Sequence, residues 1–155
     1  MISHLNKSNK PIMIDISNKN KSLRIAKAIG TVKFSKKTFI KIISLKTKKG
    51  EIINTAINAG ILGAKNTSQL IPLCHNILIE NISINIVRSN NNNSLIVTCI
   101  VKTTGKTGVE MEALTGVSIA CLTIYDMCKS IDKKILIKDI KIIQKSGGKS
   151  DFVIT

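Results

Sequence analysis

The fold is decided by the stretch ILIENISINIVRSNNNNSLIVTCIVKTT, which covers residues 77–104. Apolar residues recur at alternate positions in both halves of this stretch, which predicts two half-buried strands at 77–88 and 94–104. Four asparagines separate the halves at 90–93. Asparagine tolerates the left-handed dihedral angles of tight turns, so the two strands are predicted to pair as an antiparallel hairpin.

Helical and strand-like patterns alternate on both sides of the hairpin. Ser35 is placed to cap a helix, and Thr107 and Glu110 have the spacing of a capping box. Residues 1–10 are polar and are expected to be frayed. Extended patterns predict strands at 12–16, 24–34 and 135–145, and apolar residues at helical spacing predict helices at 35–45, 53–64 and 107–131.

These elements predict a single domain over residues 1–155. Helices segregated from a mostly antiparallel sheet define the α+β class, and a two-layer sandwich with the helices on one face covers both kinds of apolar surface. A content of 43% apolar residues supports one buried core and excludes global disorder.

Charge and cysteine usage narrow the class of protein. The formal net charge of +15 attracts polyanions such as nucleic acid, nucleotides or acidic membranes, without selecting one of them. No segment approaches the roughly 20 apolar residues of a membrane-spanning helix, and no signal-peptide pattern opens the chain. A soluble, cytoplasmic protein is expected. The four cysteines have no zinc-site spacing, so they are interpreted as reduced core thiols and no metal is expected.

Two segments carry the end of the phosphate-loop pattern GxxxxGK(S/T), at residues 105–107 and 148–150. The first glycine of that pattern would fall at Ile100 or Ile143, inside predicted strands, so neither segment is a true phosphate loop. Each segment can still offer backbone N–H groups and a lysine to a phosphate.

Ionisable residues at the ends of predicted elements are the candidates for chemistry. Asp126 and Lys129 are three residues apart, which fits either a solvated ion pair or a lysine whose lowered pKa lets it move protons. Glu110 and Glu112 either stabilise a helix N-terminus or bind the donor edge of a purine-like ring. His75 is either a satisfied loop histidine or a ligand-binding residue.

Four motifs make the chain resemble one family. They are LIPLCH at 70–75, TGKTGVEMEALT at 104–115, LTIYDMCK at 122–129 and KSGGKS at 145–150. They closely resemble the molybdenum cofactor biosynthesis protein C family, the cyclic pyranopterin monophosphate synthases. The resemblance runs from about residue 13 to residue 152. The chain departs from the family at Asn76, where proline is common, and in a tail that is one glycine shorter.

The resemblance implies a fold, an activity and an assembly. The family is ferredoxin-like and converts (8S)-3',8-cyclo-7,8-dihydroguanosine 5'-triphosphate into cyclic pyranopterin monophosphate, with release of pyrophosphate. It needs no cofactor and no obligatory metal. It forms a homohexamer, a trimer of dimers, with active sites at subunit interfaces, and neither nucleic acid nor a membrane is a partner.

The resemblance also assigns residues. Asp126 and Lys129 would be an acid-base pair, and Lys49 a second catalytic lysine. The remaining motif positions would contact the substrate: Leu73, Cys74, His75, Glu110, Met111, Glu112, Lys145 and Arg24.

A basic nucleic-acid-binding module is the alternative, and only the net charge supports it. The chain has four aromatic residues and no RNA-binding sheet signature, although bases are usually gripped by stacking on aromatic rings. Tight, salt-dependent binding of generic RNA without turnover of the cyclised nucleotide would favour this alternative.

Overall fold

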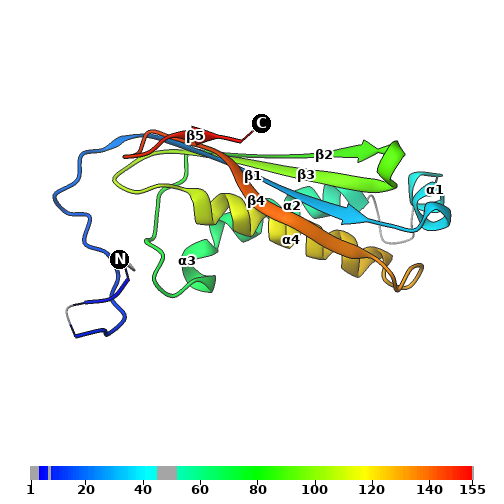
Figure 1. Ribbon diagram of the computed structural model, residues 1–155, viewed down its shortest axis with the longest axis horizontal. Coiled ribbons are helices and arrows are strands. Elements are labelled where there is room, and N and C mark those ends of the chain that lie inside the picture. Colours follow the sequence, from blue (N-terminus) through cyan, green and yellow to red (C-terminus); the bar gives the residue numbers. More distant parts are fainter. Residues whose placement is uncertain (1–3, 7, 45–51, 155) are drawn as a thin grey trace.

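The computed structural model describes residues 4–6, 8–44 and 52–154. In this part of the chain an antiparallel sheet is combined with helices (Figure 1). A short 3-10 turn, Asn90–Asn92, joins the strands β2 (Asn81–Ser89) and β3 (Ser94–Gly105). The elements are β1 (Ser22–Lys33), α1 (Lys36–Ser44), α2 (Ile52–Lys65), α3 (Thr67–Leu70), β2 (Asn81–Ser89), β3 (Ser94–Gly105), α4 (Glu110–Cys128), β4 (Leu136–Ser146) and β5 (Phe152–Val153).

The sheet has the strand order β2-β3-β1-β4-β5, and every neighbouring pair is antiparallel. Helices α2, α3 and α4 lie on one side of the sheet (Figure 1). The first four strands and the helices between them follow the ferredoxin-like order, with β1 at the centre of the sheet. The predicted α+β two-layer sandwich is confirmed.

The central hairpin is confirmed in pairing and turn. Strands β2 and β3 pair along their lengths, and Asn93 has the left-handed φ of 50° that the asparagine run predicted. The predicted start of the first strand is wrong, because β2 begins at Asn81 and not at residue 77. Ile77 and Ile79 precede the strand and pack against the core from a connecting segment.

Glycines let α4 pack closely against the sheet and against its neighbouring helix α2. A Cβ atom on Gly30 of β1 would lie 2.6 Å from Cγ1 of Val117 on α4. A Cβ atom on Gly60 of α2 would lie 2.8 Å from the carbonyl oxygen of Gly116 on α4. Both distances are too short for a side chain, so these glycines set how closely the layers pack.

Helix α4 corrects the expectation that no segment approaches a membrane span. It has 19 residues and is apolar enough, by length and composition, to cross a membrane, but half of it is buried inside the fold. Its contacts are with β1, β3, β4 and α2, so its packing is that of a core helix.

The predicted strand at residues 12–16 is wrong. This segment lies outside every strand, and an isolated antiparallel bridge joins Leu5 to Pro11 instead. The alternation has another cause: Ile14 and Ile16 line a pocket, while the residues between and around them are exposed. Alternating apolar residues show which side chains are covered, but they do not show that a neighbouring strand is present to pair with the segment.

The predicted capping box at α4 is also wrong. The helix begins at Glu110 after Val109, which provides no side-chain cap. Instead, the Glu110 carboxylate lies 3.0 Å from Nζ of Lys145 on β4. The helix ends at Cys128, before the predicted residue 131. Two elements, α3 and β5, were not predicted, because they are too short to show a period.

Asp132 connects the start of α1 to the turn after α4. Its carboxylate accepts backbone N–H groups from Ser35, at 3.1 Å, and from Lys134, at 2.8 Å. These hydrogen bonds stabilise the charged form and lower the pKa of Asp132 to about 2. Ser35 caps α1 as predicted, with its Oγ accepting the N–H of Thr38 at 3.4 Å.

We expect Asp132→Asn to lower the melting temperature near neutral pH, because an amide oxygen is a weaker acceptor than a carboxylate. A folded-state pKa below the ordinary value of 3.8 stabilises the fold above that value, and the contribution is lost as the pH falls through about 2. The difference between variant and wild type should therefore shrink on acidification in thermal melts. Asp139→Asn is the control, since Asp139 is exposed on β4 and pairs with its neighbour Lys138. A deficit that does not change with pH would contradict this role.

Candidate active site

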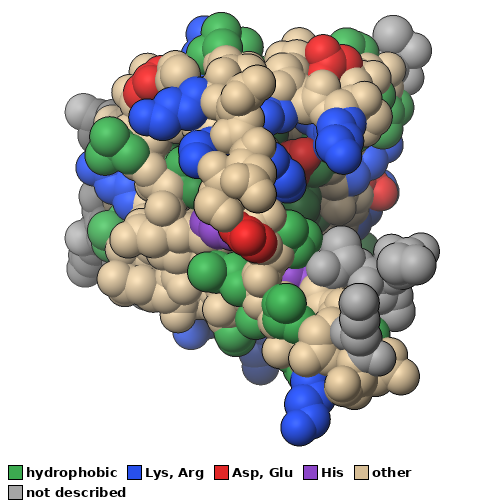
Figure 2. Space-filling model, turned by 90° about the vertical axis from the view of Figure 1, so that its left-hand side faces the viewer, with side chains coloured by type: hydrophobic (Ala, Val, Ile, Leu, Met, Phe, Trp, Pro, Cys, Tyr) green, Lys and Arg blue, Asp and Glu red, His purple; other side chains and the backbone are tan. Residues whose placement is uncertain are grey.

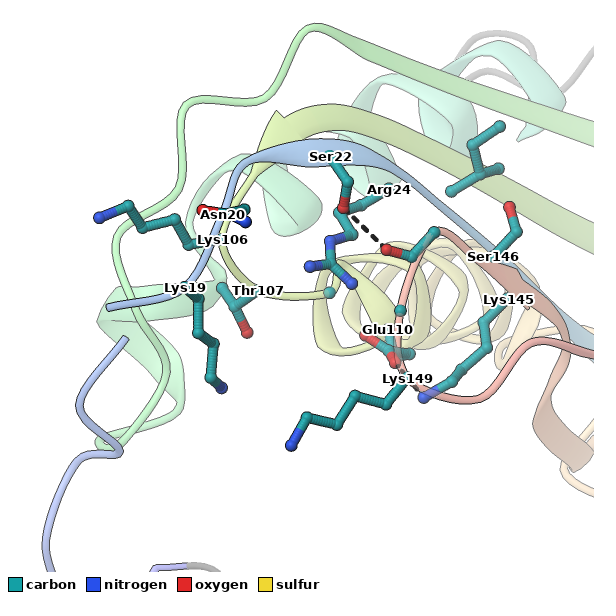
Figure 3. Close-up of a pocket in the computed structure, with 14 residues that line it drawn as sticks. Lys19, Asn20, Ser22, Arg24, Lys106, Thr107, Glu110, Lys145, Ser146 and Lys149 are labelled. Carbon is teal, nitrogen blue, oxygen red and sulfur yellow. Dashed lines mark hydrogen bonds and ion pairs between the residues drawn. The ribbon is translucent and has the colours of Figure 1, made fainter. Parts of the chain in front are cut away.

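One end of the sheet collects residues from four elements. Because the strands are antiparallel, β1 begins where β3 and β4 end, and the N-terminus of α4 lies at the same place. A pocket of about 430 Å³ opens there, and we call it the cationic pocket (Figure 3). Its lining is Lys19, Asn20, Ser22, Arg24, Ile25, Lys106, Thr107, Gly108, Glu110, Lys145, Ser146, Gly147, Gly148 and Lys149.

Positive charge dominates the cationic pocket. Lys145 is paired with Glu110 at 3.0 Å, and both side chains are about two-thirds or more buried. Arg24 donates from Nε to the carbonyl oxygen of Gly105 at 3.4 Å, and in Figure 3 the end of its guanidinium points toward the space between Thr107 and Glu110. Three further lysines, 19, 106 and 149, line the same pocket. Five cations against one carboxylate favour a ligand with several negative charges.

Both fragments of the phosphate-loop pattern line the cationic pocket. The segment 105–107 supplies Lys106 and Thr107, and the segment 148–150 supplies Lys149. The segment 105–107 joins β3 to α4 and so has the strand-loop-helix order of a phosphate loop, but the sheet is antiparallel and Ile100 stands at the position of the first glycine. The segment 148–150 lies in the tail between β4 and β5. The fold nonetheless brings Lys106 and Lys149 to the same pocket, although the two fragments are far apart in the sequence.

The tail after β4 is held in a defined path at the edge of the pocket. Gly147 has a φ of +86°, and a Cβ atom there would lie 1.8 Å from the carbonyl oxygen of Leu23. The Ser22 hydroxyl donates to the Gly147 carbonyl at 2.8 Å, and the Gly148 N–H donates to Asp151 at 3.2 Å. Only glycine satisfies both the dihedral angle and the contact at position 147.

A second pocket of about 150 Å³, which we call the small pocket, adjoins the first. The two pockets share Lys19, Thr107, Gly108 and Glu110. The sequence-predicted contacts Leu73, Cys74, His75, Met111 and Glu112 all line the small pocket, together with His4, Ile14, Ile16 and Ile77. The structure thus brings eight predicted substrate contacts, including Arg24, Glu110 and Lys145, to two joined pockets.

Burial raises the pKa of two groups that line the small pocket, the Glu112 carboxyl and the Cys74 thiol. Glu112 is 4% exposed, and burial followed by repulsion from Glu110 raises its pKa. Burial and the nearby Glu112 raise the pKa of the Cys74 thiol. Cys99, Cys121 and Cys128 are free and buried in the core, in agreement with the interpretation from the sequence. No group of three or more His, Cys, Asp or Glu residues that could hold a metal occurs among the described residues.

The predicted acid-base pair lies away from both pockets. Asp126 and Lys129 are at the C-terminal end of α4, more than half exposed, with Lys129 Nζ 2.6 Å from Asp126 Oδ1. Sixteen residues separate Glu110 from Asp126, which is about 24 Å along a helix. The hydrogen bond that Lys129 donates to Asp126 raises the pKa of Lys129 in the single chain, contrary to the lowered pKa expected of a proton-moving lysine. Lys49 lies outside the described residues.

The sequence analysis did not identify every residue of the site. It gave no role to Lys19, which is one lysine among many, or to His4, which precedes every predicted element. Both belong to the N-terminal arm, by which we mean residues 4–6 and 8–19. Ile14 and Ile16 of the arm line the small pocket. Hydrogen bonds from His75 to the Ile14 carbonyl and from Lys106 to the Ser17 carbonyl attach the arm to the site.

Comparison with known proteins gives consistent results. A model of the MoaC family matches residues 13–148. Cyclic pyranopterin monophosphate synthase from Helicobacter hepaticus is 50% identical over 153 residues, which is 98% of this chain and 96% of the relative. Proteins of the same name from Clostridium acetobutylicum and Clostridium perfringens are 47% and 49% identical, over 97% and 96% of this chain and 93% and 94% of theirs.

These matches include every motif by which the sequence resembled the family. The site motifs at 70–75, 104–115 and 122–129 lie inside the matched range, and so does most of the tail motif. The family match therefore covers the lining of both pockets except His4 and Lys149, and it covers the helix between the pockets and the Asp126–Lys129 pair. The chain belongs to the MoaC family.

Proposed function

We propose that the chain is a lyase of molybdenum cofactor biosynthesis that forms cyclic pyranopterin monophosphate. Its substrate would be (8S)-3',8-cyclo-7,8-dihydroguanosine 5'-triphosphate and its second product pyrophosphate. The relatives carry the name of this activity. The observation that supports it best is a pocket with five cations joined to a smaller pocket with hydrogen-bonding groups. A nucleoside triphosphate derivative has the same division into a charged and a heterocyclic part.

The cationic pocket is the proposed triphosphate site. Clustered lysine and arginine side chains bind the phosphates and stabilise the charge that develops on departing pyrophosphate. The N-terminus of α4 adds partial positive charge at the same place. The small pocket is the proposed heterocycle site. Burial raises the pKa of Glu112 there, which favours a carboxyl group that could donate a hydrogen bond to a ring oxygen or nitrogen.

The two pockets of one chain would form only part of the active site. Asp126 and Lys129 are about 24 Å from Glu110 along α4, so in the proposed site a second chain would supply them. We propose a homohexamer, a trimer of dimers, in which each site combines the pockets of one chain with Asp126, Lys129 and Lys49 of a neighbour. Such an assembly is consistent with the exposure of the pair in the single chain.

Proton transfer would be the task of the lysines. The raised pKa of Lys129 beside Asp126 favours the ammonium form, which is a proton donor. Lysine and arginine side chains from the cationic pocket would lower that pKa once the chains assemble, so that Lys129 can also accept a proton. The cyclic phosphate would then form when a sugar hydroxyl attacks the α-phosphorus. The hydroxyl proton passes to a base, and the bond to the pyrophosphate oxygen breaks.

The direct test is to incubate the purified protein with the cyclised GTP derivative. We expect the cyclic pterin and pyrophosphate to appear in equal amounts, and GTP to stay unchanged as the control substrate. We also expect a soluble, cytoplasmic enzyme. Generic RNA provides the competing test, since a nucleic-acid-binding module would bind it with a steep dependence on salt. Tight RNA binding with no turnover would refute the proposed lyase.

A further inference from the structure

The N-terminal arm is built as a folded segment. The Asn6 side chain accepts the backbone N–H groups of Ser8 and Lys10, both at 2.9 Å. The His4 carbonyl accepts the N–H of Ile12 at 3.0 Å, next to the bridge between Leu5 and Pro11. These bonds turn the chain back on itself and give His4 a defined place.

Two side chains from the site attach the arm. The Nε2 atom of His75 lies 2.8 Å from the carbonyl oxygen of Ile14, and because a carbonyl can only accept, Nε2 is the donor. Nζ of Lys106 donates to the carbonyl oxygen of Ser17 at 2.6 Å. Figure 1 shows the arm in blue beside the green segment that joins α3 to β2, which is the segment that carries His75. The arm is therefore a wall of the small pocket.

The arm brings two ionisable side chains to this pocket, His4 and Lys19, and of these His4 is the one that does not also line the cationic pocket. It lines the small pocket with Cys74, His75 and Glu112, and Figure 2 shows histidine on this end of the molecule, below a group of lysine and arginine side chains. Its Nδ1 atom is buried and has no hydrogen-bond partner among the described residues. Burying an unpaired polar atom is unfavourable, so a ligand that hydrogen-bonds to Nδ1 would gain binding free energy. Rotation about its Cβ–Cγ bond breaks no hydrogen bond at Nδ1.

We propose that His4 is a further substrate-binding residue, which hydrogen-bonds the heterocycle of a guanine-derived nucleotide in the small pocket. The inference rests on the proposed function and extends the site to the N-terminal arm. Imidazole can both donate and accept, which suits a ring that presents N–H groups and a carbonyl oxygen on one edge. The phosphates remain in the cationic pocket and do not reach His4.

The kinetic test compares His4→Phe and His4→Gln with wild type on the cyclised GTP derivative. Phenylalanine keeps the ring shape and removes both nitrogens. The value of kcat/KM should therefore fall by about tenfold, which is the effect of losing one hydrogen bond to a polar ligand. Most of this loss should appear as a higher KM. Glutamine keeps a donor and an acceptor and should recover part of the loss. Ser8→Ala is the matched control, because the exposed Ser8 contributes its backbone and not its side chain to the arm. Unchanged kinetics in His4→Phe would overturn the proposal.

The binding test needs no turnover. The chain has two histidines, so the nitrogen signals of histidine-labelled protein can be assigned by their loss in His4→Phe. GTP should shift the His4 signals, whereas inorganic tripolyphosphate, which can fill the cationic pocket alone, should leave them in place. Equal shifts with both ligands, or none with GTP, would overturn the role of His4. A wild type that fails to turn over substrate but shows the GTP-specific shift would instead refute the proposed function.

Discussion

Lys129→Ala is expected to abolish formation of the cyclic pterin and to leave the fold intact. The side chain is more than half exposed at the end of α4 and pairs with Asp126, so its removal disturbs no core packing. Loss of a proton-transfer group costs about a hundredfold to ten-thousandfold in rate. Turnover of the cyclised GTP derivative measures the effect, and circular dichroism checks the fold. Lys133→Ala is the control, since this exposed lysine lies just beyond the pair and lines neither pocket.

The same variant tests whether the active site is shared between chains. Lys145→Ala removes a cation of the pocket, whereas Lys129→Ala removes the distant acid-base group. If one site takes these residues from two chains, co-expression of the two inactive variants should restore about a quarter of the wild-type rate, because random assembly makes that share of intact interfaces. Mixed oligomers without any activity would contradict the proposed composite site.

Gly147→Ala is expected to have the largest effect on stability and to impair binding as well. The φ of +86° is unfavourable for any residue with a Cβ atom, and that atom would lie 1.8 Å from the carbonyl oxygen of Leu23. Either the tail or the start of β1 must move, at a cost of more than about 2 kcal/mol in the free energy of unfolding. Since Arg24 follows Leu23 directly, the movement also displaces a cation of the pocket. Chemical denaturation and the KM for substrate measure the two effects.

Gly148→Ala is the matched control for stability. A Cβ atom there would meet Nη1 of Arg24 at 3.1 Å, which is the end of a flexible side chain, and otherwise only Ser150 N at 4.0 Å. We expect its free energy of unfolding to stay within about 0.5 to 1 kcal/mol of wild type. Similar destabilisation by both substitutions would show that the positive φ and the contact with Leu23 are not what position 147 requires.

Most of the fold could be predicted from periodicity, because its elements are long. β2, β3, β4 and α4 run for at least nine residues each, and their buried faces repeat often enough to define a period. The errors occurred where a local pattern had two physical causes. At 12–16 the alternation reflects Ile14 and Ile16, which line a pocket. At α4 the carboxylate of Glu110 pairs with Lys145 of β4, although its spacing from Thr107 is that of a capping box.

Part of the candidate site could likewise be predicted from the sequence, and part could not. Motifs alone assigned Cys74, His75, Glu110, Glu112 and the Asp126–Lys129 pair to one family site. The helix predicted at 107–131 already put Glu110 near its start and the pair near its end, but it could not show which other elements meet the start of the helix to form the pockets. The motifs also gave no sign of the N-terminal arm, whose attachment depends on two bonds to residues far along the chain.

The sequence by itself determined the α+β class, the central hairpin and the family, since these depend on period, turn chemistry and long motifs. Only the tertiary structure decided which of the many lysines gather in one pocket, which wall the N-terminal arm supplies, and that the Asp126–Lys129 pair lines neither pocket. The physical reason is that the antiparallel sheet brings the start of β1 to the ends of β3 and β4, so residues distant in sequence share one electrostatic field.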